Sequence, residues 1–265
     1  MNRRRLLLIA PLLGVICSLV ATWGTPAVAT IATPDAPPSP FFGPTTCLAG
    51  AVAPGSYVRL TIAGNCSISA GKVVVLTNLI IQNGASLNAI TPQQLVVKGN
   101  ATVGRGAVFG FGCGPASTPS CSTPPDDRIR GTLTAVNPLA VIVHSSRIFG
   151  AVSVTGGGGG VSCTPVPLLG TMSPVFTTFE DSQLNGGLSV DSMRSCWFGV
   201  IRNMAGNNIS VTNNIFGSTD ANEIVNNTVF GNLSCFNNSP QAHIGDSMGG
   251  PNTVTGFKRG ECASL

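Results

Sequence analysis

Four copies of one 14-residue pattern predict an all-β protein that folds as a right-handed parallel β-helix, a solenoid of about 20–25 residues per coil. The copies begin at His144, Glu180, Ile201 and Val225 and align without a gap. Their ninth to eleventh columns read VSV, LSV, ISV and LSC, and apolar residues that alternate with serine at period two are typical of strands. Column seven holds glycine or asparagine, which supply the positive φ that tight bends need.

The spacing of the copies also favours stacked coils. The steps between equivalent apolar residues are 36, 21 and 24 residues, counted through Val152, Leu188, Ile209 and Leu233. Units of this length, with insertions at fixed places, are typical of solenoids, in which each repeat contacts only its neighbours. The register predicts parallel strands at Leu95–Val97, Val141–Val143, Val152–Val154, Leu188–Val190 and Ile209–Val211.

The first residues have the order of parts found in secretion signals. Arg3–Arg5 are followed by an apolar run too short for a comfortable membrane span, and then by the small residues Ala27–Ala29. We therefore predict a signal peptide at residues 1–29 and a secreted or cell-surface protein, with the general and twin-arginine export routes both open. We expect no membrane span once the signal is removed.

The rest of the chain divides into two parts. The proline-rich residues 30–46 lack a core pattern and indicate a linker. Residues 47–265 are then one β-helix domain, which is long enough to build a sizeable core. The repeat is lost from about residue 239 to residue 265. This short irregular segment is expected to cap the end of the stack, where strand groups would otherwise stay unpaired.

The mature chain is nearly neutral in charge. The signal holds three of the 14 Lys and Arg residues and none of the 10 Asp and Glu residues, which leaves 11 basic against 10 acidic side chains. A chain of this balance, without a basic stripe or an aromatic platform, is not expected to bind nucleic acid.

Eight cysteines follow the signal, and an even number in an exported chain indicates disulfides. The sequence leaves their pairing open, but the coil register favours near neighbours. The expected pairs are Cys47 with Cys66, Cys113 with Cys121, Cys163 with Cys196, and Cys235 with Cys262. None of the eight has the spacing of zinc ligands, and the glycine run at 156–160 lacks the other residues of a phosphate loop. We therefore predict neither a metal nor a cofactor.

The densest charge in this charge-poor chain falls in the first columns of the repeat. The register places His144 beside Glu180, and Asp181 about 5 Å from Arg202, on neighbouring coils. The candidate site residues are Asp126, His144, Glu180, Asp181 and Arg202. One interpretation is a carbohydrate groove with paired carboxylates or a calcium ion beside an arginine. The simpler interpretation is a row of ion pairs and asparagine ladders at the corner of the coils.

Two insertions interrupt the coils, at Gly104–Pro125 and Gly156–Val175. Loops that leave a rigid scaffold often carry function, so these two segments are the expected surroundings of a site.

Several phrases resemble a family of exported actinobacterial proteins: GNATVGRGAVFGFGC, DDRIRGTLTAVNPLAVIVHSS, SCWFGVIRN and NTVFGNLSCFNNSP. The resemblance runs through the mature domain and implies secretion and a right-handed β-helix. It implies no activity, so no catalytic residue is taken from it. More remotely, the coil pattern is similar to the pectate-lyase superfold, a likeness of fold that does not determine function. The lyase motifs themselves are not evident.

The sequence thus predicts an exported, non-enzymatic β-helix protein, an envelope-associated structural or surface-binding module. Its candidate partner is a cell-wall or extracellular glycan. The alternative is a polysaccharide lyase or glycoside hydrolase that acts through the polar row. Trp197 is the one tryptophan after the signal and Tyr57 the one tyrosine, so little aromatic surface is available to stack on sugar rings, which favours the first hypothesis.

Overall fold

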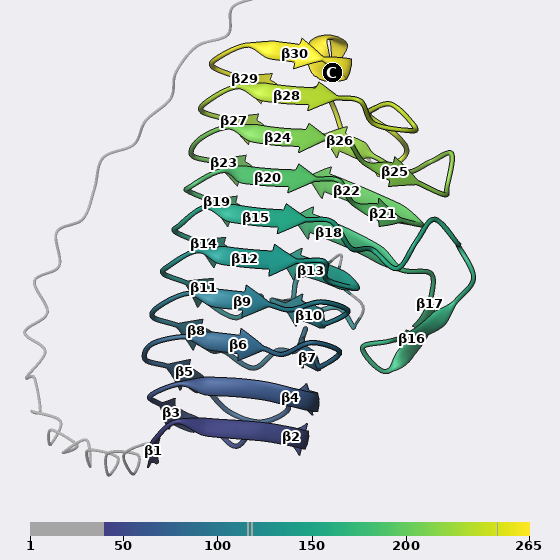
Figure 1. Ribbon diagram of the computed structural model, residues 1–265. Coiled ribbons are helices and arrows are strands. Elements are labelled where there is room, and N and C mark those ends of the chain that lie inside the picture. Colours follow the sequence, from purple (N-terminus) through teal and green to yellow (C-terminus); the bar gives the residue numbers. More distant parts are fainter. Residues whose placement is uncertain (1–39, 116, 118, 248) are drawn as a thin grey trace, which may run out of the picture. The chain divides into compact units, whose positions relative to one another are not determined.

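The protein is described by a computed structural model, which covers residues 40–115, 117, 119–247 and 249–265. The predicted signal peptide and most of the predicted linker lie outside these residues. The described chain is a parallel β-helix, in which strands from successive coils lie side by side (Figure 1). The fold class expected from the repeat is therefore confirmed.

The coils have three faces. The first is a ten-stranded parallel sheet. Its strands are β1 (Phe41–Phe42), β3 (Gly55–Tyr57), β5 (Val73–Val75), β8 (Leu95–Val97), β11 (Arg128–Ile129), β14 (Arg147–Ile148), β19 (Gln183–Leu184), β23 (Met204–Ala205), β27 (Thr228–Val229) and β29 (Thr253–Val254).

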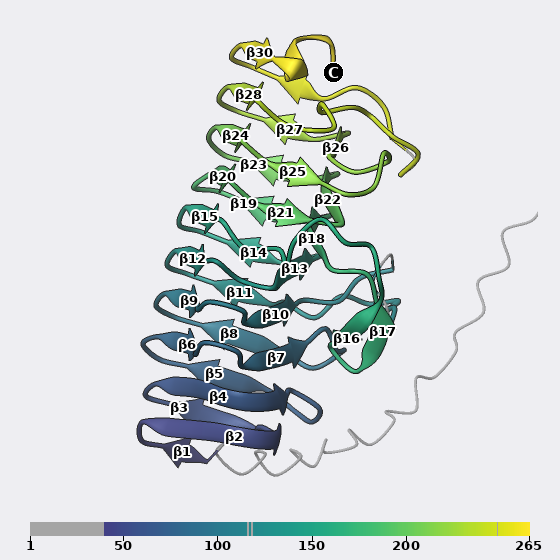
Figure 2. The same ribbon diagram turned by 45° about the vertical axis from the view of Figure 1, so that its right-hand side comes forward.

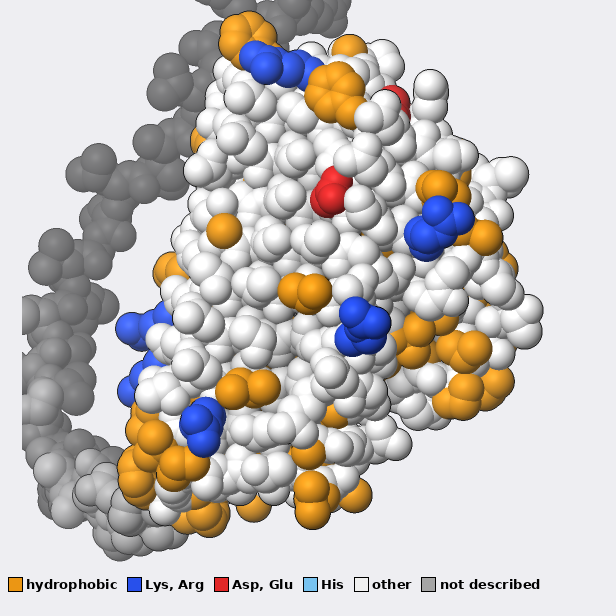
Figure 3. Space-filling model, viewed as in Figure 1, with side chains coloured by type: hydrophobic (Ala, Val, Ile, Leu, Met, Phe, Trp, Pro, Cys, Tyr) orange, Lys and Arg blue, Asp and Glu red, His pale blue; other side chains and the backbone are white. Residues whose placement is uncertain are grey.

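The other two faces belong to one sheet, which divides at the long strand β4 (Leu60–Ser67). The start of β4 pairs with β6, and its end pairs with β7. The second face comprises β6 (Leu79–Ile81), β9 (Ala101–Val103), β12 (Leu133–Val136), β15 (Val152–Thr155), β20 (Leu188–Asp191), β24 (Ile209–Thr212), β28 (Leu233–Phe236) and β30 (Lys258–Gly260). Figure 3 shows that this side of the molecule carries few charged groups.

The third face carries the long connections, and we call it the loop-bearing face. Its strands are β7 (Ser86–Ala89), β10 (Val108–Phe111), β13 (Ala140–His144), β18 (Phe176–Glu180), β22 (Trp197–Ile201) and β26 (Glu223–Val225). An antiparallel hairpin of β16 (Val166–Leu168) and β17 (Thr171–Ser173) projects from this side (Figure 2). The strands outside these sets are β2 (Thr45–Ala51), which pairs with β4, and the pair β21 (Arg194–Ser195) and β25 (Ile215–Phe216).

The register follows the sequence repeat, and all five predicted strands are present. Leu188 pairs with Ile209, which in turn pairs with Leu233. Leu188 and Val190 are buried, whereas Ser189 between them is exposed, as the alternation of a strand requires. The inward side chains of successive coils form one core along the described stack. Each fully buried Val, Leu, Ile or Phe stabilises the fold by about 1.5–3 kcal/mol, so the stabilisation is spread evenly over the coils.

A second, smaller core lies outside the stack, between the loop-bearing face and the two insertions. It consists of Ile90, Val108, Cys113, Cys121, Ala140, Ile142, Leu168 and Val175. Leu169 at the tip of the hairpin lies against Gly110, where a Cβ atom would come within 2.5 Å of Leu169 Cδ1. The absence of a side chain at Gly110 thus lets the hairpin pack closely on β10.

Both ends of the stack contain more strand than the sequence indicates. Strand β1 lies inside residues 30–46, the segment assigned to the linker, because Phe42 stacks on Tyr57 with ring centroids 4.8 Å apart. The cap at 239–265 contains one further coil, made of β29 and β30, and a 3-10 helix, η1 (Glu261–Ser264). The sequence conceals that coil because Lys258, Arg259 and Gly260 stand in the columns that hold Leu233, Ser234 and Cys235 one coil earlier.

The eight described cysteines form four disulfides: Cys47–Cys66, Cys113–Cys121, Cys163–Cys196 and Cys235–Cys262. This is the pairing that the coil register favours. The first and last bonds join neighbouring coils at the two ends of the stack, and the second and third hold the two insertions of the loop-bearing face.

Candidate functional site

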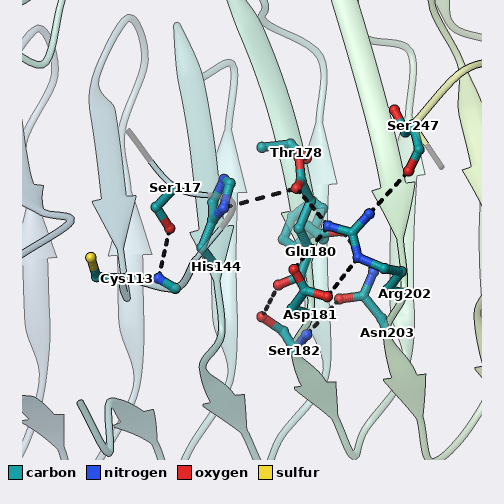
Figure 4. Close-up of polar contacts among 12 residues, drawn as sticks. Cys113, Ser117, His144, Thr178, Glu180, Asp181, Ser182, Arg202, Asn203 and Ser247 are labelled. Carbon is teal, nitrogen blue, oxygen red and sulfur yellow. Dashed lines mark hydrogen bonds and ion pairs between the residues drawn. The ribbon is translucent and has the colours of Figure 1, made fainter. Parts of the chain in front are cut away.

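The polar row lies at the edge of the loop-bearing face, where its strands end. His144 and Glu180 are the last residues of β13 and β18 and pair in register. Asp181 and Arg202 occupy the turns that follow β18 and β22, with φ of 51° and 55°. Figure 4 shows the side chains of these four residues side by side. The predicted proximity of His144 to Glu180 and of Asp181 to Arg202 is therefore found in the structure.

Arg202 links the two acids. Its Nε atom lies 2.7 Å from Asp181 Oδ1 and its Nη2 atom 2.9 Å from Asp181 Oδ2, a bidentate pair. The same Nη2 atom lies 3.3 Å from Glu180 Oε2, and Nη1 donates to the carbonyl oxygen of Ser247 at 3.1 Å. The hydrogen bonds to Asp181 raise the pKa of Arg202. The guanidinium group thus stays charged and fixes both carboxylates.

His144 is held in a different state. Its side chain is buried, its Nδ1 atom lies 4.0 Å from Glu180 Oε2, and this nitrogen makes no hydrogen bond within the described chain. Burial lowers the pKa of the imidazole, although the nearby charge of Glu180 acts in the opposite direction. The imidazole is therefore neutral at physiological pH. The other oxygen of Glu180, Oε1, accepts a hydrogen bond from Thr178 at 2.8 Å.

A cavity of about 450 Å³ opens beside His144 and Glu180, under the β16–β17 hairpin. Its walls are otherwise mostly apolar, and they come from Ile90, Pro119, Ile142, Leu168, Leu169, Met172 and Phe176. Both predicted insertions contribute to it, through Pro119 and through the hairpin. A cavity of this size, with apolar walls and polar groups at one place, is typical of small-molecule sites.

Asp126 keeps its predicted column of the repeat, because Arg128 pairs with Arg147 and Arg147 with Gln183, but the coil of Ser145 separates it from Asp181. It pairs with Arg128, with 2.5 Å between Oδ2 and Nη2, and lines a separate cavity of about 180 Å³ together with Asp127 and Asp181. The insertion at Gly104–Pro125 ends directly before Asp126, and the strand that follows pairs in register with the next coil.

Asp127 is the residue that the sequence interpretation underrated. It is 1% exposed, and its Oδ1 atom accepts a hydrogen bond from the Leu95 amide at 2.5 Å. Burial raises the pKa of Asp127 to about 7, because a charged carboxylate loses its hydration there. The sequence does place Asp127 in the third column of the repeat. Side chains of that column point inward, so its burial could have been predicted.

The third column forms a buried hydrogen-bond ladder behind the site. Asn203 Nδ2 donates to Asn227 Oδ1 at 3.1 Å, and Asn227 Nδ2 donates to Asn252 Oδ1 at 2.8 Å. Ser182 continues the ladder toward Glu180, since its amide donates to Asn203 Oδ1. The residues that carry Asp181 and Arg202 are thus fixed from inside the stack.

No protein family, curated protein or solved structure matches this chain. In the part of the chain that the structure describes, no helix has the length and apolar character needed to cross a membrane. The four disulfides indicate a fold that matures in an oxidising compartment.

Proposed function

We propose that the protein is an exported, non-enzymatic binding module of the cell envelope, and that the cavity under the β16–β17 hairpin takes a glycan bearing an apolar substituent. The observation that carries the proposal is the composition of this cavity, which combines mostly apolar walls with the polar side chains of His144 and Glu180. An acyl or methyl group would contact the walls, and sugar hydroxyls would hydrogen-bond to the imidazole and the carboxylate. Export is supported by the signal-like N-terminus and by the four disulfides.

The fixed state of the carboxylates favours binding over catalysis. Each oxygen of Asp181 accepts from Arg202, and the two oxygens of Glu180 accept from Thr178 and Arg202. A carboxylate held in this way is a rigid hydrogen-bonding surface for a ligand. A general acid, by contrast, needs a carboxyl group free to hold and release a proton.

The second candidate is a polysaccharide lyase or glycoside hydrolase, and His144 is the observation that favours it. A neutral imidazole with a free Nδ1 atom at the wall of a cavity is a reasonable general base, with Glu180 4.0 Å away. The two proposals differ in one measurable property, which is whether a bound glycan is cleaved.

The test is a glycan array that includes acylated and methylated polysaccharides, together with a depolymerisation screen on the same set. Met172 lines the cavity and is 66% exposed, so Met172→Ser should fold normally and weaken binding about 10-fold or more through lost apolar contact. Met204→Ser is the matched control, since Met204 is also exposed but lies on β23, away from the cavity.

Three outcomes would count against binding at this cavity: no glycan bound, equal losses in both methionine variants, or binding that does not depend on an apolar substituent. Cleavage of a bound glycan, reduced about 100-fold by Glu180→Gln with an unchanged melting curve, would establish the enzyme instead.

A further inference from the structure

A second group of chemically active side chains lies on the loop-bearing face, apart from the cavity. Glu223 begins β26 and forms a parallel bridge with His243, which comes from the cap segment. Asp220 precedes β26 in the connecting loop. One ligand atom from each of these three residues lies within 4.8 Å of the other two. None of the three belongs to the repeat pattern, so the sequence interpretation did not single them out.

One carboxylate oxygen of Glu223 is unsatisfied. The residue is 1% exposed, and its Oε2 atom has no hydrogen-bond partner among the described residues. The carboxylates of Asp220 and Glu223 thus lie close together, and that of Glu223 is removed from water. A buried carboxylate oxygen without a partner is costly unless a cation or a proton compensates it.

The imidazole of His243 is oriented toward the same place. Its Nδ1 atom lies 3.3 Å from the carbonyl oxygen of Gln241. Because a carbonyl oxygen only accepts, Nδ1 is the donor in this hydrogen bond, and Nε2 is directed toward Asp220 Oδ1, 3.6 Å away. Either a second ring proton or a metal ion can bridge Nε2 and this carboxylate oxygen. A backbone carbonyl that orients a histidine in this way is the usual outer contact of a metal ligand.

We propose that Asp220, Glu223 and His243 bind one divalent metal ion, with Zn²⁺ the best fit. Bonds of about 2.0–2.1 Å in tetrahedral geometry place neighbouring ligand atoms about 3.3 Å apart, close to the separation of His243 Nε2 from Asp220 Oδ1. One imidazole and two carboxylates suit Zn²⁺, whereas Ca²⁺ prefers six to eight oxygen ligands. Three protein ligands leave the fourth position to water or to an external ligand.

Such an ion would join three separate segments of the chain. His243 belongs to the cap, Glu223 to the stack, and Asp220 to the loop that precedes β26. The carbonyl oxygen of Asp220 accepts a hydrogen bond from Trp197 Nε1 at 2.8 Å. The ion would therefore hold the cap segment against the last coils. This assignment does not depend on a ligand in the cavity under the hairpin.

Trp197 provides the readout, since it is the only tryptophan that follows the predicted signal. We expect the full exported chain, stripped of metal by a chelator with its disulfides intact, to bind one Zn²⁺ in calorimetry, with a change in tryptophan fluorescence and a rise in melting temperature. Co²⁺ should give visible bands typical of a tetrahedral site. Ca²⁺ and Mg²⁺ added alone should bind at least 10-fold more weakly.

The variants Asp220→Asn, Glu223→Gln and His243→Gln should each weaken Zn²⁺ binding at least 10-fold and reduce the Co²⁺ bands. Two control variants remove a carboxylate and an imidazole that lie outside the cluster. Asp191→Asn removes a partly buried acid from β20, and His144→Gln removes the other histidine of the chain. Neither should change Zn²⁺ binding.

If Glu223→Gln fails to fold, the exposed Asp220→Asn decides the question. The assignment is overturned if Zn²⁺ produces no heat, if the stoichiometry is not one, or if the control variants lose as much affinity as the cluster variants.

Discussion

At the scale of single residues, the most consequential side chains are the polar groups that the coil register turns inward. Asn227 is the central member of the buried ladder. Its Oδ1 atom accepts from the Asn203 amide at 2.9 Å, and its Nδ2 atom donates to the Val200 carbonyl at 2.7 Å. Each bond satisfies a backbone group that would otherwise be buried without a partner, so the ladder is a structural requirement of the coils.

Replacing Asn227 with alanine should lower the free energy of unfolding by about 2–4 kcal/mol, because it leaves the Asn203 amide and the Val200 carbonyl unpaired. Urea denaturation measures the loss. Asn207→Ala is the matched control, since Asn207 is exposed, and it should cost no more than about 0.5 kcal/mol. Equal costs for the two variants would mean that the ladder contributes little.

Asp127 makes stability depend on pH. Its pKa is about 7 in the folded protein against 3.8 in a model peptide, so between these values the folded state keeps a proton that the unfolded state has released. The contribution of Asp127 to the free energy of unfolding is therefore fully present near pH 4. It falls as the pH rises to 7, by at most about 4 kcal/mol. Asp127→Asn should remove this slope and be more stable than the native protein at pH 8.

Comparing the native protein with Asp127→Asn separates the pH dependence caused by Asp127 from that caused by His144. The lowered pKa of His144 has the opposite effect, because it reduces stability as the pH falls below 6.5. Asp126→Asn, next in the sequence and exposed, serves as the control. If unfolding measured at several pH values gives parallel curves for the native protein and Asp127→Asn, the carboxyl group is not protonated in the fold.

At the scale of elements, the β16–β17 hairpin decides the shape of the cavity. It belongs to an insertion, and its two strands pair with each other and pack on the loop-bearing face through Leu168 and Leu169. Another contact is polar: Asn88 Nδ2 donates to the Leu169 carbonyl oxygen at 3.2 Å. A short hairpin is marginal by itself, so these contacts set how often it opens.

Asn88→Ala should make hairpin opening more frequent. We expect amide exchange in β16 and β17 to accelerate about fivefold, the effect of about 1 kcal/mol, while exchange in β13 and β18 stays unchanged. Asn65→Ala is the control, because Asn65 lies one coil away and its side chain accepts only from Ser86. Equal acceleration in the two variants would show that Asn88 does not hold the hairpin.

An element could be predicted from the sequence when its residue pattern recurs from coil to coil. Strands such as Leu188–Val190 were readable because alternation and turn residues recur in each coil. The hairpin was not, since VPLLGTMS contains a proline and has no counterpart in other coils. His144 and Glu180 were placed correctly because both lie within the repeat window. Glu223 meets His243 only through the turn of the cap, which no repeat specifies.

At the scale of the whole molecule, stability is distributed along a column of similar coils. Each coil contacts its neighbours, so the ends are the places where unfolding begins. Disulfides Cys47–Cys66 and Cys235–Cys262 lie at those ends. Their pairing was predictable because stacked coils leave few cysteines close together in space.

Protein matured under oxidising conditions should contain no free thiol from Cys47 onward. Thiol titration of the denatured, unreduced protein should give no more than a trace, and eight thiols per chain should appear after reduction, from the eight cysteines that follow the signal. Peptide mapping should return the four pairs described above. A free thiol in the unreduced protein, or a mapped pair that joins other coils, would contradict this arrangement.

The two terminal disulfides also determine how a mechanical load would pass through the protein. A pulling force applied at the N-terminal side reaches Cys47 and crosses directly to Cys66, 19 residues further on, so the segment between them, which includes β3, bears no tension. At the other end, the bond between Cys235 and Cys262 shields the intervening segment in the same way. A chain held at one end and loaded at the other would thus transmit tension to its interior coils, while the segments enclosed by the two terminal disulfides bear none.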